Sequence, residues 1–235
     1  MSDEVAIRVN FGRPMPVFPL HAVTLMPHAL LHLHIFEPRY RQMVTDALDG
    51  PGQIAMAIFK GDHWRQTYHG RPALREAMCV GQIVAHEQMA DGRFNLALHG
   101  VCRARLVSEL PADEERLYRS ALLEPIAVEE TDNDALKPTR LNLIRLLAKS
   151  SLHDLKHASD IVAHLRDQDV PTSAVLELVT ILILENDELR YQLLEESDVQ
   201  CRANLVLDQL RSLQRLLDRA APQRLGLTEK GCSWN

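Results

Sequence analysis

Hydrophobic and polar residues alternate over the first half of the chain in short segments that predict β-strands. The alternation is clearest from Leu30 to Ile35, where aliphatic side chains face one way and His32, His34 and the following Phe36 face the other. Asp91-Gly92, between two further segments, is a strong signal for a tight hairpin. These short, mostly antiparallel strands predict a small, partly closed barrel. The remaining strand segments are Pro16–Leu20, Gln53–Phe59, Met78–Gln88, Arg93–His99, Cys102–Leu110 and Arg119–Val128.

One helix is predicted inside the β-rich half, over residues 37–48. Glu37 favours the positive end of the helix dipole, and Pro38 suits the first turn, where a missing N–H costs nothing. The chain turns away at Asp49-Gly50-Pro51-Gly52, which ends the helix. Apolar residues at steps of three and four predict its buried face, namely Tyr40, Met43, Val44, Ala47 and Leu48.

The pattern becomes helical after the polar stretch Glu129–Asp134. Ala174–Leu184 is apolar on most sides and is expected at the centre of a bundle. A stripe at alternating steps of four and three runs from Val199 to Leu217 and predicts a long helix. We therefore predict an α+β protein with a β-rich barrel over residues 1–130, a helical bundle over 131–221 and a flexible tail over 222–235.

Composition and charge narrow the class of protein. Hydrophobic residues make up 46% and charged residues 25%, which is ordinary for a globular protein. Each half of the chain, divided at residue 130, carries 13 basic and 16 acidic residues. A nonspecific nucleic-acid binder normally presents a cationic face, so this acidic balance disfavours nucleic acid as a partner.

The expected location of the protein, and the expected redox state of its cysteines, rest on targeting and membrane-spanning signals that the sequence does not show. The start, Met1-Ser-Asp-Glu-Val5, shows no basic region followed by an apolar core, and no apolar stretch is long enough to span a bilayer. We expect a cytoplasmic protein without membrane contact, in which the four cysteines stay reduced. The cysteines form no Cys-x-x-Cys pair, which argues against a structural zinc site.

The front of the chain carries a recognisable signature. Phe18-Pro19-Leu20, Met26-Pro27 and the run from His34 to Arg41 resemble the Lon protease N-terminal (LON substrate-binding) domain family, in particular its standalone bacterial branch. The resemblance covers Pro16 to Leu217 and implies a PUA-like pseudobarrel. The family usually has glycine where this chain has His28, and glycine there would serve a positive φ. Histidine tolerates that region better than most residues, so we expect the turn to survive.

The catalytic motifs of Lon proteases are missing from this sequence. The ATP-binding loop Gly-x-x-x-x-Gly-Lys-Ser/Thr does not occur, and no lysine has the context of a Ser–Lys protease pair. Gly-x-Ser-x-Gly and His-Glu-x-x-His are absent as well. The resemblance therefore implies a non-enzymatic module without cofactors, which binds polypeptide clients or works beside a protease or chaperone. Its oligomeric state stays open.

The candidate binding site lies at the predicted strand-to-helix junction. Phe36, Glu37, Arg39 and Tyr40 would form an amphipathic ridge, with aromatic anchors and an arginine that orients carboxylate or backbone groups. Alternatively, Glu37 and Arg39 fix the junction itself. We favour this structural role, and the two roles are not exclusive.

Two other functions remain open at this level. PUA-like barrels sometimes bind RNA, which would show as salt-dependent binding. His32 and His34, which share a strand face, could hold a divalent metal together with Glu37 and support a small hydrolase. Ordinary surface histidines explain the same pattern, so no metal is our first expectation.

Overall fold

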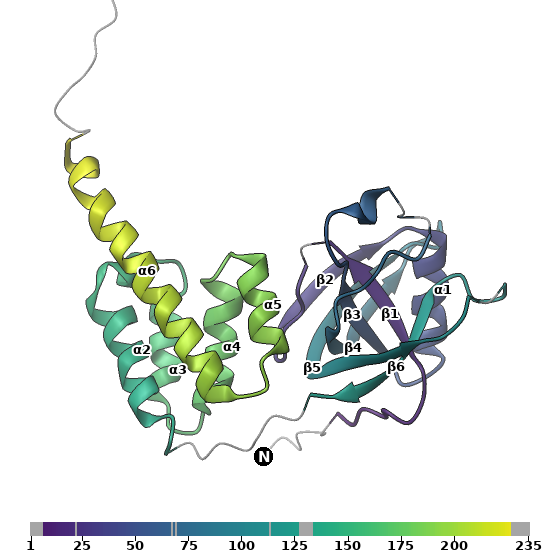
Figure 1. Cartoon of the computed structure of the whole chain (residues 1–235), viewed down its shortest axis with the longest axis horizontal. Coiled ribbons are helices and arrows are strands. Elements are labelled where there is room, and N and C mark those ends of the chain that lie inside the picture. The colour runs from purple at the N-terminus through teal and green to yellow at the C-terminus, as the bar shows by residue number, and fades with distance from the viewer. Residues whose placement is uncertain are drawn as a thin grey trace, which may run out of the picture. The chain divides into compact units, whose positions relative to one another are not determined.

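The protein divides into two compact units, which Figure 1 shows in a computed structural model. The structure describes residues 7–21, 23–66, 68, 70–112, 114–126 and 134–226, of which 221–226 are described by their backbone alone. The first unit, here the barrel unit, contains the strands and the segment Asn186–Ser197. The second, here the helical unit, contains the other helices of the second half. No helix in these residues is long and apolar enough to cross a membrane.

Six strands form one sheet in the order β2-β5-β4-β3-β1-β6. Because β5 also pairs with β6, five of the strands close into a ring, and β2 adds to the outside of β5. Only β1 and β3 run parallel. The partly closed barrel expected from the sequence is confirmed, as is the α+β class. The strands are β1 (Met15–Leu20), β2 (Leu30–Ile35), β3 (Gln53–Ile58), β4 (Ala77–Gln88), β5 (Phe94–Glu109) and β6 (Arg119–Pro125).

The barrel interior is filled by small and medium side chains. All six residues of β3 are buried, since β1 and β4 flank this strand and side chains cover both of its faces. A second layer of partly buried aromatic residues, including Trp64 and Tyr68, packs on this core from outside. The core includes Met15, Val17, Ala55, Ala57, Phe59, Leu74, Met78, Val80, Ala104, Ala121 and Leu123.

Strand β5 corrects one prediction. The sequence suggested two strands, Arg93–His99 and Cys102–Leu110, but a single strand continues through Gly100. A Cβ on Gly100 would lie 2.0 Å from the carbonyl oxygen of Met26, so only glycine lets the two backbones approach here. His28 donates its N–H to the Gly100 oxygen at 2.8 Å. Gly100 therefore joins the strand to the loop before β2 and does not interrupt it.

The strand-to-helix corner agrees with the sequence. His28 adopts φ +65°, the positive value expected where the family usually has glycine. Strand β2 keeps His32 and His34 exposed, while Ile35 is buried. Helix α1 (Pro38–Leu48) begins one residue after Glu37 and buries Tyr40, Met43, Val44 and Ala47 against the barrel.

The helical unit has a core of leucine, isoleucine and valine. The stripe predicted on the last helix is buried from Val199 to Leu210, and it becomes half-buried at Leu213 and Leu217. Two short 3-10 turns also occur, η1 (His63–Arg65) in the barrel unit and η2 (Ser151–Asp154) in the helical unit. The helices of this unit are α2 (Lys137–Lys149), α3 (Ala158–Arg166), α4 (Thr172–Leu182) and α6 (Val199–Gly226).

Helix α5 (Asp187–Glu195) belongs to the barrel unit, whereas the predicted bundle over 131–221 included it. The N–H of Ala77 on β4 donates to the Tyr191 hydroxyl at 3.0 Å. The Arg75 guanidinium lies 3.4 Å from the centre of the same ring and pairs with Glu188 at 2.6 Å. Buried Arg103 of β5 donates to the Leu193 carbonyl at 3.3 Å. These contacts join the helix to β4 and β5, although it is far from them in sequence.

The ends of the predicted units differ slightly from the structure. Helix α6 continues to Gly226, beyond the predicted bundle end at 221 and into the predicted tail. Most of the polar break at Glu129–Asp134 and the rest of the predicted tail, 227–235, lie outside the described residues.

Candidate functional site

The four residues of the predicted ridge lie in different surroundings. Phe36 is 61% exposed and stands away from the helix, near the ring of His34. Glu37 and Arg39 are half-buried. Tyr40 is 4% exposed, because its ring packs against Phe18 with 4.5 Å between centroids. Only part of the predicted ridge is therefore open to a ligand.

Glu37, Arg39 and Tyr68 form one hydrogen-bonded network. Arg39 Nη2 lies 2.9 Å from Glu37 Oε2, and the Tyr68 hydroxyl donates to Glu37 Oε1 at 2.6 Å. The Arg39 guanidinium lies between two rings, 4.5 Å from Tyr40 and 4.6 Å from Tyr68. The structural role expected for Glu37 and Arg39 is thus present, since they connect the start of α1 to the loop that carries Tyr68.

Burial and neighbouring charges both shift the pKa values of the side chains in this network. Burial raises the pKa of Tyr40 far above its usual value, although the Arg39 charge opposes the shift. Burial and the hydrogen bond to Glu37 also raise the pKa of Tyr68. Burial lowers the pKa of Arg39, but Tyr40 and Glu37 raise it more, so the guanidinium stays charged. Both tyrosines therefore remain neutral near pH 7, and Tyr68 donates its hydroxyl to Glu37.

An open depression of about 680 Å³, here the Arg39 depression, borders this network. Its lining is mainly apolar, with arginines interspersed, and Leu117 is 58% exposed in it. Three of the predicted ridge residues lie in its wall, and Phe36 does not. The lining residues are Glu37, Pro38, Arg39, Tyr40, Gly70, Arg71, Ala112, Arg116, Leu117, Tyr118 and Arg119.

Two of these arginines share one carboxylate, that of Glu109 on β5. Arg119 binds it through two nitrogens at 2.5 and 2.8 Å, and Arg71 Nη2 lies 3.1 Å from it. Burial alone would raise the pKa of Glu109, but the two guanidinium groups hold it below its usual value. Arg119 also donates to the Pro72 carbonyl, which leaves its side chain 11% exposed. Arg119 is therefore fixed, and Arg71 is the more accessible member of the pair.

A second depression of about 430 Å³, here the Trp64 depression, has aromatic walls. Trp64 stacks on Phe59 with 5.3 Å between centroids and on His21 with 4.8 Å. Tyr68 meets the Trp64 ring edge-on at 5.9 Å, and it also contacts Arg39. Tyr68 therefore connects the two depressions. Pro19, Leu20 and Arg65 complete the lining.

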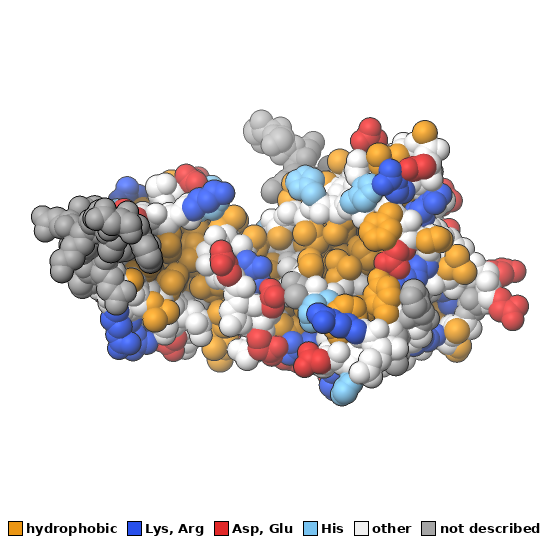
Figure 2. Space-filling model, turned by 90° about the horizontal axis from the view of Figure 1, so that it is seen from above, with side chains coloured by type: hydrophobic (Ala, Val, Ile, Leu, Met, Phe, Trp, Pro, Cys, Tyr) orange, Lys and Arg blue, Asp and Glu red, His pale blue; other side chains and the backbone are white. Residues whose placement is uncertain are grey.

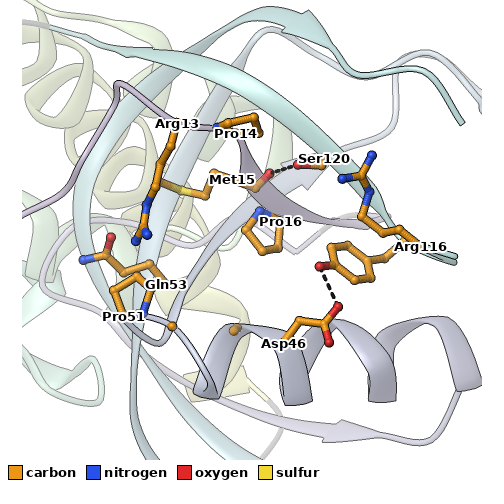
Figure 3. A pocket seen from close by; sticks show the side chains of 12 residues that line it. Arg13, Pro14, Met15, Pro16, Asp46, Pro51, Gln53, Arg116 and Ser120 are labelled. Carbon is orange, nitrogen blue, oxygen red and sulfur yellow. Dashed lines mark hydrogen bonds between the residues drawn. The ribbon is translucent and has the colours of Figure 1, made fainter. Parts of the chain in front are cut away.

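A third and smaller depression, about 230 Å³, lies on the other side of Tyr118 and is drawn in Figure 3. Asp46 reaches into it from α1, with Arg13 and Gln53 opposite (Figure 3). The Tyr118 hydroxyl donates to Asp46 at 2.9 Å, and burial together with this bond raises its pKa to about 12. Because Arg116 and Tyr118 line this depression and the Arg39 depression, the two are contiguous.

Of the two histidines considered for metal binding, His34 has hydrogen-bond partners. His34 Nδ1 lies 2.7 Å from Asn95 Oδ1, and its Nε2 lies 3.3 Å from Arg93 Nη1. Glu37, the expected third ligand, is engaged by Arg39 and Tyr68. Among the described residues, no group of three or more His, Cys, Asp or Glu side chains could hold a metal ion. His32 and His34 instead border a shallow depression over β2, β5 and β4.

Several lining residues were not anticipated from the sequence. Trp64 and Tyr68 stand in a polar loop between strands, and two large aromatic residues in such a loop are a signal that could have been used. Arg71, Arg116 and Leu117 carry no local signal, since only folding brings them to α1. Seen from above, hydrophobic side chains gather on the barrel unit, with histidine and charged side chains of both signs around them (Figure 2).

Two solved structures share this fold. The N-terminal domain of a Mycobacterium avium complex Lon protease matches with a TM-score of 0.64 and 17% identity, over 85% of this chain and 98% of that one. A Lon N-terminal domain protein from Xanthomonas campestris matches with a TM-score of 0.57 and 21% identity, over 83% of this chain and 98% of that one. At these identities the likeness establishes the fold. No curated protein matches the sequence.

The arrangement of strands and helices is that of Lon N-terminal domains. The sequence model of the ATP-dependent protease La (LON) substrate-binding domain matches residues 14–212. The chain belongs to this family, as the signature around Glu37 predicted. The domain is the substrate-binding module of these proteases and not their catalytic part.

Proposed function

We propose that this protein binds exposed polypeptide segments without changing them chemically, on the surface formed by the Arg39 and Trp64 depressions. One observation carries the proposal: two open, mainly apolar depressions lie on the barrel unit, and Tyr68 of the one contacts Arg39 of the other. The family's substrate-binding role supports it. The proposal places this binding in the cytoplasm, beside a protease or chaperone that acts on the captured polypeptide.

The surface has the chemistry that such recognition needs. Unfolded segments differ in sequence, so their common features are apolar side chains and backbone carbonyls. Trp64 and Leu117 offer apolar contact area, and tryptophan is among the residues that contribute most to binding energy at interfaces. Arg39 offers N–H donors held in place by Glu37. Phe36, which the sequence suggested as a further anchor, is exposed but lines neither depression.

A matched pair of substitutions tests the proposal. Leu117→Ser removes an apolar side chain from the Arg39 depression, and Leu141→Ser removes an equally exposed one from α2, at 58% and 56% exposure. The probe is a fluorescent, reduced and carboxymethylated polypeptide that cannot fold, and its binding is measured by anisotropy. We expect Leu117→Ser to weaken binding by about three- to tenfold, from the loss of one apolar contact, and Leu141→Ser to leave it unchanged.

Two results would contradict the proposal. One is equal affinity of the Leu117→Ser variant and the unchanged protein, which would remove the Arg39 depression from recognition. The other is displacement of the probe by single-stranded RNA at low salt, which would favour the RNA-binding alternative. Urea unfolding of both variants, with equal midpoints, establishes that the comparison concerns binding alone.

A further inference from the structure

We propose that the Arg39 depression binds the free carboxyl terminus of a polypeptide whose last residue is apolar. This rests on the proposed function and specifies which part of a client the site recognises. Four arginines and several apolar side chains line one depression of about 680 Å³, and this juxtaposition carries the inference. A terminal residue presents an apolar side chain and a carboxylate from the same backbone unit, which fits that combination.

Basic residues outnumber acidic ones in the lining of the depression, whereas acidic residues outnumber basic ones in the first 130 residues of the chain. The first 130 residues carry 13 basic and 16 acidic residues. The depression is lined by Arg39, Arg71, Arg116 and Arg119, and among the described residues Glu37 is its one acidic lining residue. Glu109 binds two of these arginines from outside the lining. Glu37 and Glu109 thus hold Arg39, Arg71 and Arg119, which sets two carboxylates against three guanidinium groups and favours an anionic ligand.

Two of the arginines retain hydrogen-bonding capacity. A guanidinium has five N–H donors. Arg71 uses a single nitrogen, Nη2, for its bonds to Glu109 and to the Leu110 carbonyl, and its side chain is 35% exposed. Arg39 directs Nε and Nη2 to Glu37, while Nη1 makes only a 3.4 Å contact with the Tyr68 carbonyl. Within the described residues, both side chains thus keep N–H groups for a carboxylate.

The same carboxylates that neutralise these arginines also hold them in place. Glu37 and Glu109 fix Arg39 and Arg71 before any ligand arrives. A ligand carboxylate therefore binds donors that have already lost much of their side-chain freedom, which lowers the entropic cost of binding. Arg116 lies in the wall shared with the smaller depression (Figure 3).

The apolar part of the lining accounts for the last residue of the ligand. Pro38, Tyr40, Ala112, Leu117 and Tyr118 provide it. The volume lies within the range of pockets that enclose a small ligand, so it holds a few residues and not a long segment. A bound chain terminus leaves such a site in one direction, whereas a bound internal segment must leave it in two directions. The size therefore favours a terminus over an acidic side chain within a chain.

The test compares three peptides by fluorescence anisotropy on the full chain. The first ends in leucine with a free carboxylate, and the second is identical but ends in a carboxamide. The third is the carboxamide with an internal aspartate near its end. We expect the free acid to bind at least about tenfold more tightly than either carboxamide, because a charged hydrogen-bonded pair is lost. Equal binding of acid and carboxamide would overturn the inference, and so would equal binding of the aspartate peptide.

A matched pair of variants locates the carboxylate. Arg71→Met removes a half-exposed arginine that pairs with Glu109, and Arg93→Met removes one that pairs with Asp91 outside the depression. We expect Arg71→Met to abolish most of the preference for the free acid, Arg71→Lys to restore part of it, and Arg93→Met to keep it. A preference unchanged in both Arg71→Met and Arg39→Met would overturn the assignment to this depression.

The outcome separates this inference from the function on which it rests. Should the unfolded polypeptide bind while the acid and the carboxamide bind equally, the inference fails and the proposed function stands. Should neither the unfolded polypeptide nor any peptide bind, both fail. Urea unfolding of each variant shows that it is folded under the conditions of the binding measurement.

Discussion

Arg39 and Arg71 of the barrel unit are used in the opposite way to Arg140 of the helical unit. In the barrel unit, Arg39 and Arg71 lie near the surface, pair with carboxylates and keep donors beside an apolar depression. In the helical unit, Arg140 is 8% exposed, and it donates five hydrogen bonds to backbone carbonyls and a threonine hydroxyl of the described residues. The first arrangement leaves guanidinium N–H donors at the surface for a ligand. The second uses these donors for hydrogen bonds inside the fold.

The position of Arg140 explains the difference. Its guanidinium reaches the end of α3 and the connection to α4, where the carbonyls of His164, Leu165, Asp167 and Val170 have no helical partners of their own. A buried charge is costly unless it is hydrogen-bonded, and these oxygens supply the bonds. Arg140 thus joins three helices, which an apolar residue could not do.

The largest effect is expected from Arg140→Met. The substitution keeps much of the volume, but it removes the donors from the buried Leu165 carbonyl and from three partly buried carbonyls, so we expect the free energy of unfolding to fall by at least about 3 kcal/mol. Urea unfolding followed by circular dichroism measures the change. Arg145→Met, at an exposed position on the same helix, is the control and should change stability by less than about 0.5 kcal/mol. Equal effects of the two substitutions would deny Arg140 its structural role.

Glu109→Gln should have the next largest effect. It removes the charge that orders Arg71 and Arg119, and we expect a loss of about 1.5–3 kcal/mol at pH 7. The pKa of Glu109 is lowered in the folded protein, so this stabilisation is present above the ordinary glutamate pKa of about 4.3 and is lost as the pH falls through the folded value.

Unfolding curves between pH 7 and pH 3 check this linkage. The unchanged protein should lose more stability over this range than the Glu109→Gln variant. Glu124→Gln serves as the control, because Glu124 is 55% exposed and 3.9 Å from Arg105. Parallel pH profiles for the unchanged protein and the Glu109→Gln variant would contradict the interpretation.

Tyr68→Phe should have a smaller effect. The substitution removes the hydroxyl that donates to Glu37 but keeps the ring against Arg39 and Trp64. We expect a loss of about 1 kcal/mol in urea unfolding, and polypeptide binding should persist because the aromatic surface remains. A loss of binding equal to that of Tyr68→Ala would show that the hydroxyl itself takes part in recognition.

The smallest effect on stability is expected from Arg71→Met. Because Arg119 still binds Glu109 through two nitrogens, we expect a change within about 0.5 kcal/mol in urea unfolding. The same substitution should nevertheless weaken binding of a carboxyl-terminal peptide. A stability loss close to that of Arg140→Met would show that Arg71 supports the fold as Arg140 does, and that the two arginines do not differ in their use.

Local signals predicted most elements of the fold. The alternation at Leu30–Ile35 gave β2 with its observed bounds, and the steps of three and four from Tyr40 gave α1. The positive φ of His28 followed from the residue that the family usually has there. Such features depend on neighbours within a few residues, so they can be read from the chain itself.

Other features required distant partners. Gly100 looked like a break between two strands, and only the approach of Met26 shows that it continues one. Helix α5 looked like a part of the bundle, and only its contacts through Tyr191 and Leu193 assign it to the barrel unit. Of the predicted ridge, Phe36 lies outside the Arg39 depression and Tyr40 is largely buried, because packing against Phe18 covers its ring.

The sequence by itself determined the family, the order of strands and helices, and the corner at Glu37, since a short signature and local periodicity are sufficient for each. Only the tertiary structure decided which residues share the Arg39 depression. Its wall combines the start of α1 with the loop at Gly70 and Arg71 and with the segment from Ala112 to Arg119. The closed ring of strands brings these three segments together. The sequence pattern within each segment does not predict which other segments will lie beside it.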